Sequence, residues 1–220
     1  MSKFDYIAFD LDGTLTDPAK GLVQGFIYAF RKMGIEYDSP DSLRKYIGPP
    51  LLESWKNELG LSYEEAERMV LIFREYYNVY GWWDNMLYDG IEELLSGLKQ
   101  SGKKLLVATS KPEDTAKRVL SLFGIDKYFD FIGGADGHKN RDKKWEVLEY
   151  SLRSVGVEPS SPLKDRCILV GDRMYDAEGA GKCGIASLGI SWGHGDPEEL
   201  KAAGFDYLLN TPREVLDFLK

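Results

Sequence analysis

The chain has few of the residues that build thiolate, disulfide or zinc sites. Its 220 residues include two cysteines and two histidines. Cys167 and Cys183 lack CxxC spacing, which predicts two reduced thiols in a cytoplasmic protein. His138 and His194 are far apart in the sequence and neither is near a cysteine, so the sequence argues against a zinc site.

Basic residues and long apolar runs are also scarce. The chain has 28 lysines and arginines against 36 aspartates and glutamates, for a net charge of −8. Nucleic-acid-binding surfaces are normally basic, so we expect no nucleic-acid polymer as a partner. No apolar run approaches the roughly 20 residues that span a bilayer, and we expect neither a membrane partner nor a signal peptide. The sequence leaves monomer and homodimer open.

Helix and strand patterns alternate along most of the chain. Residues 6–9 form a continuous apolar run, typical of a strand that is covered on both faces. From about Tyr88 onward the alternation predicts a parallel sheet with helices on both faces. Residues 16–85 have helical patterns alone. We therefore predict an α/β, Rossmann-like core of residues 1–15 and 86–220, interrupted by an all-helical domain. The other expected strands are 105–109, 131–132, 168–171, 186–190 and 207–208, and the expected core helices are 90–101, 112–123, 144–155, 177–182, 197–203 and 211–219.

Polar residues follow several of these predicted strands, where ligands bind in parallel α/β sheets. Asp10 and Asp12 come directly after the first strand. Two like charges at such a place indicate that a cation is held there. Together, the polar residues at these strand ends and at the start of one helix offer carboxylates for a cation, a hydroxyl group for a phosphate oxygen and an ammonium group that supplies positive charge. The remaining candidates are Thr109, Ser110, Asp172, Asp176 and one of Lys143 and Lys144.

Several of these residues also have a purely structural interpretation. The Asp-x-Asp-Gly segment that begins at Asp10 is a common turn sequence. Thr109 could cap the helix expected from Pro112, Ser110 could do the same, and Asp172 could cap the helix that follows it. We expect Arg173 to form an ion pair with a nearby carboxylate.

The motifs together resemble a known family. Asp-Leu-Asp-Gly-Thr-Leu at 10–15, the strand end at Thr109, the helix-opening lysine and Gly-Asp-Arg-Met-Tyr-Asp at 171–176 resemble, in this order, the four motifs of the haloacid dehalogenase superfamily. The helical insertion resembles that superfamily's cap of the first type. Thr-Ser-Lys-Pro at 109–112 and Ile-Gly-Pro-Pro-Leu at 47–51 are most similar to its phosphoglycolate phosphatase and 5′-nucleotidase-like branch.

The resemblance implies a Mg²⁺-dependent phosphatase of small phosphomonoesters. It implies that Asp10 is the nucleophile, which forms an aspartyl-phosphate, and that Asp12 is the acid and base. Thr109 and Lys144 would stabilise the phosphoryl group, and Ser110 would lend a backbone N–H to phosphate. The Lys-x-Glu-Val-Leu context at 144–148 favours Lys144 over Lys143. At the metal, the resemblance implies side-chain ligands from Asp10 and Asp172 and the backbone carbonyl of Asp12, with Asp176 orienting bound water or the metal shell.

Substrate choice is expected to depend on the helical domain. Arg44 could meet a carboxylate or second phosphate, and Gly48 and Pro49 form a stiff loop that could contact substrate or start a helix. Three alternative functions remain: a 5′-nucleotidase, a phosphomutase similar to β-phosphoglucomutase, and a non-catalytic binding domain. The intact set of candidate residues argues against the last.

Overall fold

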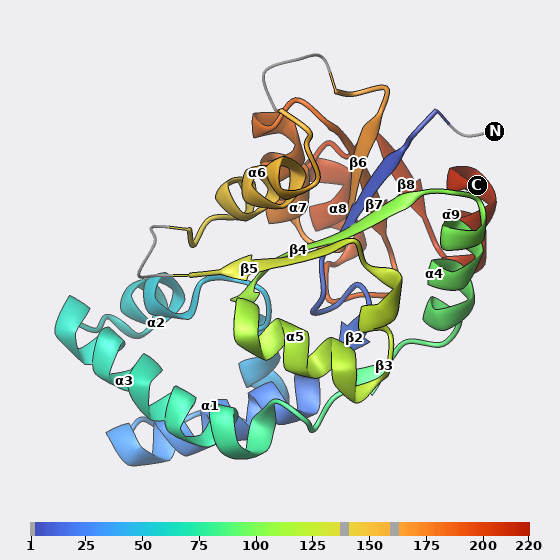
Figure 1. Ribbon diagram of the computed structural model, residues 1–220. Helices are drawn as coiled ribbons and strands as arrows, with labels where there is room; N and C mark the ends of the chain where they lie inside the picture. The colour runs from blue at the N-terminus through green and yellow to red at the C-terminus, as the bar shows by residue number, and fades with distance from the viewer. Residues whose placement is uncertain (1–2, 137–140, 159–162) are drawn as a thin grey trace. The chain divides into compact units, whose positions relative to one another are not determined.

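The chain forms two compact units. The computed structural model describes residues 3–136, 141–158 and 163–220 (Figure 1), so His138 lies outside the described residues. One unit, which we call the core, comprises Met1–Thr16 and Leu87–Lys220, and the other, which we call the cap, comprises Asp17–Met86. Within the described ranges, no helix has both the length and the apolar character needed to cross a membrane.

A six-stranded parallel sheet organises the core (Figure 1). In β1, Phe9 lies opposite Val107 on one side and Val170 on the other. This register brings the carboxyl ends of three neighbouring strands to the same edge of the sheet. The predicted α/β fold class is therefore confirmed. The strands, in spatial order, are β5 (Phe131–Ala135), β4 (Lys104–Pro112), β1 (Tyr6–Phe9), β6 (Cys167–Gly171), β7 (Ala186–Ile190) and β8 (Tyr207–Leu209).

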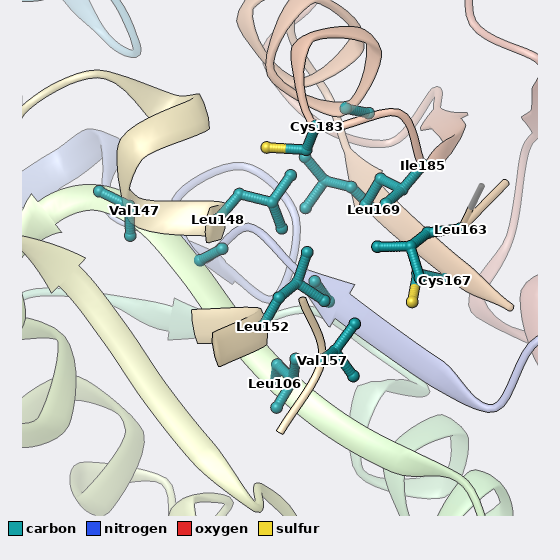
Figure 2. Close-up of a cluster of buried hydrophobic side chains, with 13 residues drawn as sticks. Leu106, Val147, Leu148, Leu152, Val157, Leu163, Cys167, Leu169, Cys183 and Ile185 are labelled. Atoms are coloured by element: carbon teal, nitrogen blue, oxygen red, sulfur yellow. The ribbon is translucent and has the colours of Figure 1, made fainter. Parts of the chain in front are cut away.

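Helices cover both faces of this sheet. Leu106 and Leu169 pack with Leu148 in one buried cluster (Figure 2). Strand residues that point the other way, such as Ile7 and Leu105, are also fully buried. Burial on both faces explains why these strands are continuous apolar runs. The core helices are α4 (Ile91–Gln100), α5 (Glu113–Leu122), η3 (Asp126–Tyr128), α6 (Lys144–Ser154), α7 (Met174–Lys182), α8 (Pro197–Ala202) and α9 (Pro212–Leu219).

Two boundaries near the expected site differ from the prediction. β4 continues to Pro112, and its register with β5 shifts between Ala108 and Pro112, so α5 begins only at Glu113. α7 begins at Met174, three residues before the expected start. The reason is that the side chain of Asp176 accepts the backbone N–H of Arg173, with a donor–acceptor distance of 3.1 Å. This contact stabilises an earlier helix start and fixes Asp176 in the first turn.

The cap has its own aromatic core. Trp55 is fully buried, and the rings of Phe26, Phe30 and Phe73 pack around it. The two-residue strands β2 and β3 pair with each other at the two ends of this segment. The remaining elements are β2 (Thr16–Asp17), α1 (Ala19–Met33), η1 (Asp41–Tyr46, 3₁₀), α2 (Leu51–Leu59), α3 (Tyr63–Tyr76), η2 (Tyr77–Gly81, a π-helix) and β3 (Met86–Leu87).

Both cysteines are free and buried in the core. Burial raises the pKa of Cys167 and of Cys183 to about 11. The thiols are therefore neutral near pH 7 and weakly nucleophilic. Figure 2 shows both in the apolar cluster beside α6, which indicates a packing role.

Candidate active site

Three buried carboxylates meet at the carboxyl edge of the core sheet. Asp10 follows β1, Asp172 follows β6, and Asp176 lies in the first turn of α7. One oxygen from each lies within 4.8 Å of the others, and the three residues are 8%, 0% and 1% exposed. Asp10 and Asp172 are neighbours because β1 and β6 pair in parallel with aligned ends. We call these three residues the acidic cluster.

Lys144 places its ammonium group beside the acidic cluster. Its Nζ lies 2.8 Å from Asp10 Oδ1 and 2.9 Å from Asp176 Oδ1. It also donates a hydrogen bond to the carbonyl of Ala108, at 3.2 Å. Burial alone would lower its pKa, but the charges of Asp10 and Asp176 outweigh that effect and raise the pKa of Lys144. Lys144 therefore stays positively charged, whereas Lys143 is an exposed residue just before α6.

The buried acidic cluster disfavours negative charge on two of its carboxyl groups. Burial, together with the charges of Asp176 and Asp10, raises the pKa of Asp172 to about 8. Burial also raises the pKa of Asp176 to about 6, although Lys144 acts in the opposite direction. Burial is the largest cause of both shifts, so the site disfavours the charged form of these two carboxyl groups.

The acidic cluster fits a divalent cation. Its donors are all carboxylate oxygens, which suit hard cations such as Mg²⁺, Ca²⁺ and Mn²⁺. A bound cation would favour the charged form of Asp172 and so oppose the effect of burial on its pKa. The residues present could therefore hold a metal ion.

Asp172 is held in place by neighbouring loops. Thr14 Oγ1 donates to its Oδ1 at 3.1 Å, and the backbone N–H of His194 donates to its Oδ2 at 2.8 Å. A Cβ atom on Gly193 would lie 2.4 Å from Asp172 Cβ, so only glycine allows this approach. This loop was not predicted from the sequence as part of the site. Its one signal was the pair of glycines in Trp-Gly-His-Gly, directly after a predicted strand.

The carboxylate of Asp12 is bound by a different lysine. Its Oδ2 lies 2.6 Å from Nζ of Lys111, a buried residue that the sequence analysis did not single out. Lys111 is the third residue of Thr-Ser-Lys-Pro, and this motif was its only signal. The structure thus brings Asp12 to the same sheet edge as the acidic cluster but gives its carboxylate a separate partner.

Thr109 and Ser110 do not have the alternative role of capping the next helix. Thr109 is buried, and its Oγ1 accepts the backbone N–H of Lys111 at 3.2 Å. Ser110 is exposed on β4. α5 begins three residues later than a Thr109 cap would require, with Pro112 at its N-cap position. The extension of β4 explains the difference.

The chain matches a known family over most of its length. Residues 7–190 match the family model described as "Haloacid dehalogenase-like hydrolase". The chain belongs to the haloacid dehalogenase-like hydrolase family. This result confirms the family that the four motifs indicated.

Individual relatives of this haloacid dehalogenase-like hydrolase carry several names. The chain is 40% identical over 189 residues to the tyrosine-protein kinase PtkA of Mycobacterium tuberculosis, covering 86% of the chain but only 62% of PtkA. It is 36% identical over 200 residues to a 5′-nucleotidase of Pseudomonas aeruginosa, covering 91% of the chain and 88% of that protein. The crystal structure of a predicted phosphatase from Clostridium acetobutylicum superposes with a TM-score of 0.91 at 38% identity, over 97% of each chain. The predicted enzyme class agrees with the last two names.

The remaining residues singled out in this haloacid dehalogenase-like hydrolase are one arginine of the core and three residues of the cap. Arg173 pairs with Glu199 at 2.8 Å, as expected for a structural ion pair. In the cap, Arg44 and Gly48 are exposed and Pro49 is half-buried. Their contact with substrate stays a prediction.

We expect the metal-free haloacid dehalogenase-like hydrolase to lose stability as the pH rises from about 4 to about 8. The pKa of Asp172 is raised from 3.8 to about 8 and that of Asp176 to about 6, so the folded chain keeps protons that the unfolded chain releases. Between its pKa in the unfolded chain and its pKa in the folded chain, each of these carboxyl groups is protonated only in the folded chain. Over that range it lowers the free energy of unfolding by about 1.4 kcal/mol per pH unit. Denaturant unfolding in a chelator, measured at several pH values, tests this.

The matched comparison for this expectation is Asp172→Asn, whose amide does not titrate. Its unfolding free energy should fall less steeply with pH than that of the wild type, because the largest contribution is gone. Comparing the two proteins cancels the contributions of unrelated groups. Parallel pH profiles for the two proteins would contradict the prediction.

Proposed function

We propose that the chain is a Mg²⁺-dependent phosphomonoester hydrolase that forms an aspartyl-phosphate on Asp10. The main observation in support is that the acidic cluster and Lys144 lie together at the carboxyl edge of the sheet. A phosphomonoester is dianionic near neutral pH and is repelled by a carboxylate. Two unit charges 4 Å apart interact by about 4 kcal/mol at an effective dielectric constant of 20, and a dianion roughly doubles this. Lys144 and a divalent cation together offset that repulsion.

Four residues would hold the cation. The side chains of Asp10 and Asp172 would supply carboxylate oxygens, Asp12 would supply its backbone carbonyl, and Asp176 would orient bound water or the metal shell. Mg²⁺ is the proposed ion because it binds one or two carboxylates together with phosphate oxygens. When bound, it neutralises negative charge on the phosphoryl group.

The residues of the chain carry the bond changes. An oxygen of Asp10 attacks phosphorus, the bond from phosphorus to the leaving oxygen breaks, and its electron pair stays on the leaving oxygen. Asp12 gives a proton to that oxygen and later takes a proton from the water that hydrolyses the aspartyl-phosphate. Lys144, 2.8 Å from Asp10, and the buried Thr109 offset charge on the phosphoryl oxygens. Ser110 adds a backbone N–H.

The substrate is proposed to be a small phosphorylated metabolite chosen by the cap. The 5′-nucleotidase relative supports nucleoside 5′-monophosphates as one candidate class. Phosphoglycolate is the other, on the resemblance of residues 109–112 and 47–51. Arg44, Gly48 and Pro49 are the cap residues proposed to contact it.

A substrate panel with and without metal tests the proposal. The purified protein is incubated with nucleoside 5′-monophosphates, phosphoglycolate, sugar phosphates and 4-nitrophenyl phosphate, and free phosphate is measured. We expect release with Mg²⁺, a loss on the order of 100-fold or more in a chelator, and recovery when excess Mg²⁺ is added.

Three results would contradict the proposed phosphomonoester hydrolase function. One is no phosphate release from any compound, and another is equal release with and without chelator. The third is transfer of phosphate from ATP to a tyrosine peptide without hydrolysis, the activity named for the PtkA relative. Conversion of a sugar 1-phosphate to its 6-phosphate without free phosphate would instead indicate a phosphomutase.

A further inference from the structure

Lys111 is a second buried lysine at the carboxyl edge of the core sheet, and the roles above leave it unused. Its Nζ lies 2.6 Å from Asp12 Oδ2, and the side chains of Lys111 and Asp12 are 4% and 19% exposed. Exposed ion pairs hold their partners weakly, whereas a largely buried pair at this distance fixes both side chains. The carboxylate of Asp12 therefore has one well-defined orientation.

The local backbone explains why Lys111 reaches Asp12. β4 and β1 are parallel neighbours, so residues at their carboxyl ends meet at one edge. Thr109 and Lys111 are buried, whereas Ser110 between them is exposed, as expected for alternating side chains in a strand. The hydroxyl of Thr109 also accepts the backbone N–H of Lys111. The register shift of β4 against β5 falls in this segment, and such irregularities commonly redirect side chains near active sites.

The two oxygens of Asp12 have different surroundings. Oδ2 is bound by Lys111, whereas the buried Oδ1 accepts no hydrogen bond from any residue that the structure describes. Asp10 and Asp176 have Lys144 as their partner instead. Each lysine thus serves a different part of the site: Lys144 serves the acidic cluster, and Lys111 serves Asp12.

We propose that Lys111 is a positioning residue, which anchors Oδ2 of Asp12 so that Oδ1 exchanges the proton with the leaving oxygen. This inference rests on the proposed function. As the bond from phosphorus to the leaving oxygen breaks, the proton on Asp12 Oδ1 moves to that oxygen and an alcohol departs. Asp12 is left as a carboxylate, and the ammonium group of Lys111, 2.6 Å away, keeps its own protons and offsets the new charge.

The test uses the dependence of rate on the leaving group. An alkyl phosphate needs a proton on its leaving oxygen, whereas 4-nitrophenyl phosphate releases an anion that is stable without one. In Lys111→Met, we expect kcat/KM for the alkyl phosphate that the wild type hydrolyses fastest to fall about 100-fold or more, and for 4-nitrophenyl phosphate to fall less than about tenfold. kcat/KM is the right quantity because it reports the steps up to departure of the leaving group.

Two further variants separate positioning from folding. Lys111→Arg keeps the positive charge and should bring the ratio of the two kcat/KM values back toward that of the wild type. Lys104→Met makes the same change at the other end of β4, where an exposed lysine pairs with Asp130 at 2.8 Å, and should leave both values unchanged. If Lys111→Met does not fold, Lys111→Gln is measured in the same way.

The outcomes separate this inference from the proposed function. Equal losses for both substrates in the Lys111 variants, or no loss for either, would overturn the inference while wild-type hydrolysis upholds the proposed function. A wild-type protein that hydrolyses neither substrate would overturn both. A selective loss with the alkyl phosphate, reversed by arginine, supports the positioning role.

Discussion

Replacing Asp10 with asparagine is expected to lower phosphate release by a factor on the order of 10⁵, the scale seen when a nucleophile is removed from an enzyme. The amide oxygen of asparagine is a weak nucleophile, and the substitution also removes one carboxylate from the acidic cluster. The measurement is kcat for 4-nitrophenyl phosphate at saturating Mg²⁺.

The matched control for Asp10→Asn is Asp165→Asn. Asp165 is an exposed carboxylate that pairs with Lys3, and its replacement should leave kcat unchanged. Unfolding curves for both variants show whether each is folded. The proposed mechanism fails if folded Asp10→Asn keeps more than about one hundredth of wild-type kcat.

Replacing Lys144 with methionine is expected to lower both stability and activity. The change leaves the carboxylates of Asp10 and Asp176 without their ammonium partner in a buried site. Removal of one member of a buried ion pair typically costs about 3–5 kcal/mol. The loss of a positive charge beside the phosphoryl group should also lower kcat by about 100-fold or more. Denaturant unfolding in a chelator and phosphate release with Mg²⁺ measure the two effects.

Lys143→Met is the matched control, with the same substitution one residue earlier. Because Lys143 is exposed, the free energy of unfolding of Lys143→Met should stay within about 0.5 kcal/mol of the wild-type value. Its kcat should not change. The comparison decides between the two lysines that the sequence offered. A larger loss in Lys143→Met than in Lys144→Met would contradict the assignment.

The position of the site could be predicted from the sequence because it depends on topology. Residues 6–9 and 168–171 are apolar runs that read as buried strands, and in a parallel sheet their carboxyl ends share an edge. That rule places Asp10 near Asp172 without any knowledge of side-chain geometry. The helix pattern from Lys144 likewise marks the start of α6.

Other features of the candidate site could not be predicted, because they depend on tertiary contacts that leave no local pattern in the sequence. The direction of Lys111 follows from the register of β4 and the hydroxyl of Thr109, and neither is visible in the hydrophobic pattern. The close approach of Gly193 to Asp172 joins residues from two loops. The start of α7 was predicted too late because it depends on the side chain of Asp176, which accepts the backbone N–H of Arg173 and for which the sequence suggested only a role at the metal.

The most direct test is to detect the covalent intermediate. Wild-type protein is quenched with acid during turnover of 4-nitrophenyl phosphate with Mg²⁺, digested, and its peptides are weighed by mass spectrometry. The proposed mechanism predicts a phosphoryl group on the peptide that contains Asp10, at that residue, and none in Asp10→Asn. Rapid phosphate release with a phosphoryl group on another residue, or with none on Asp10 at any quench time, would contradict it.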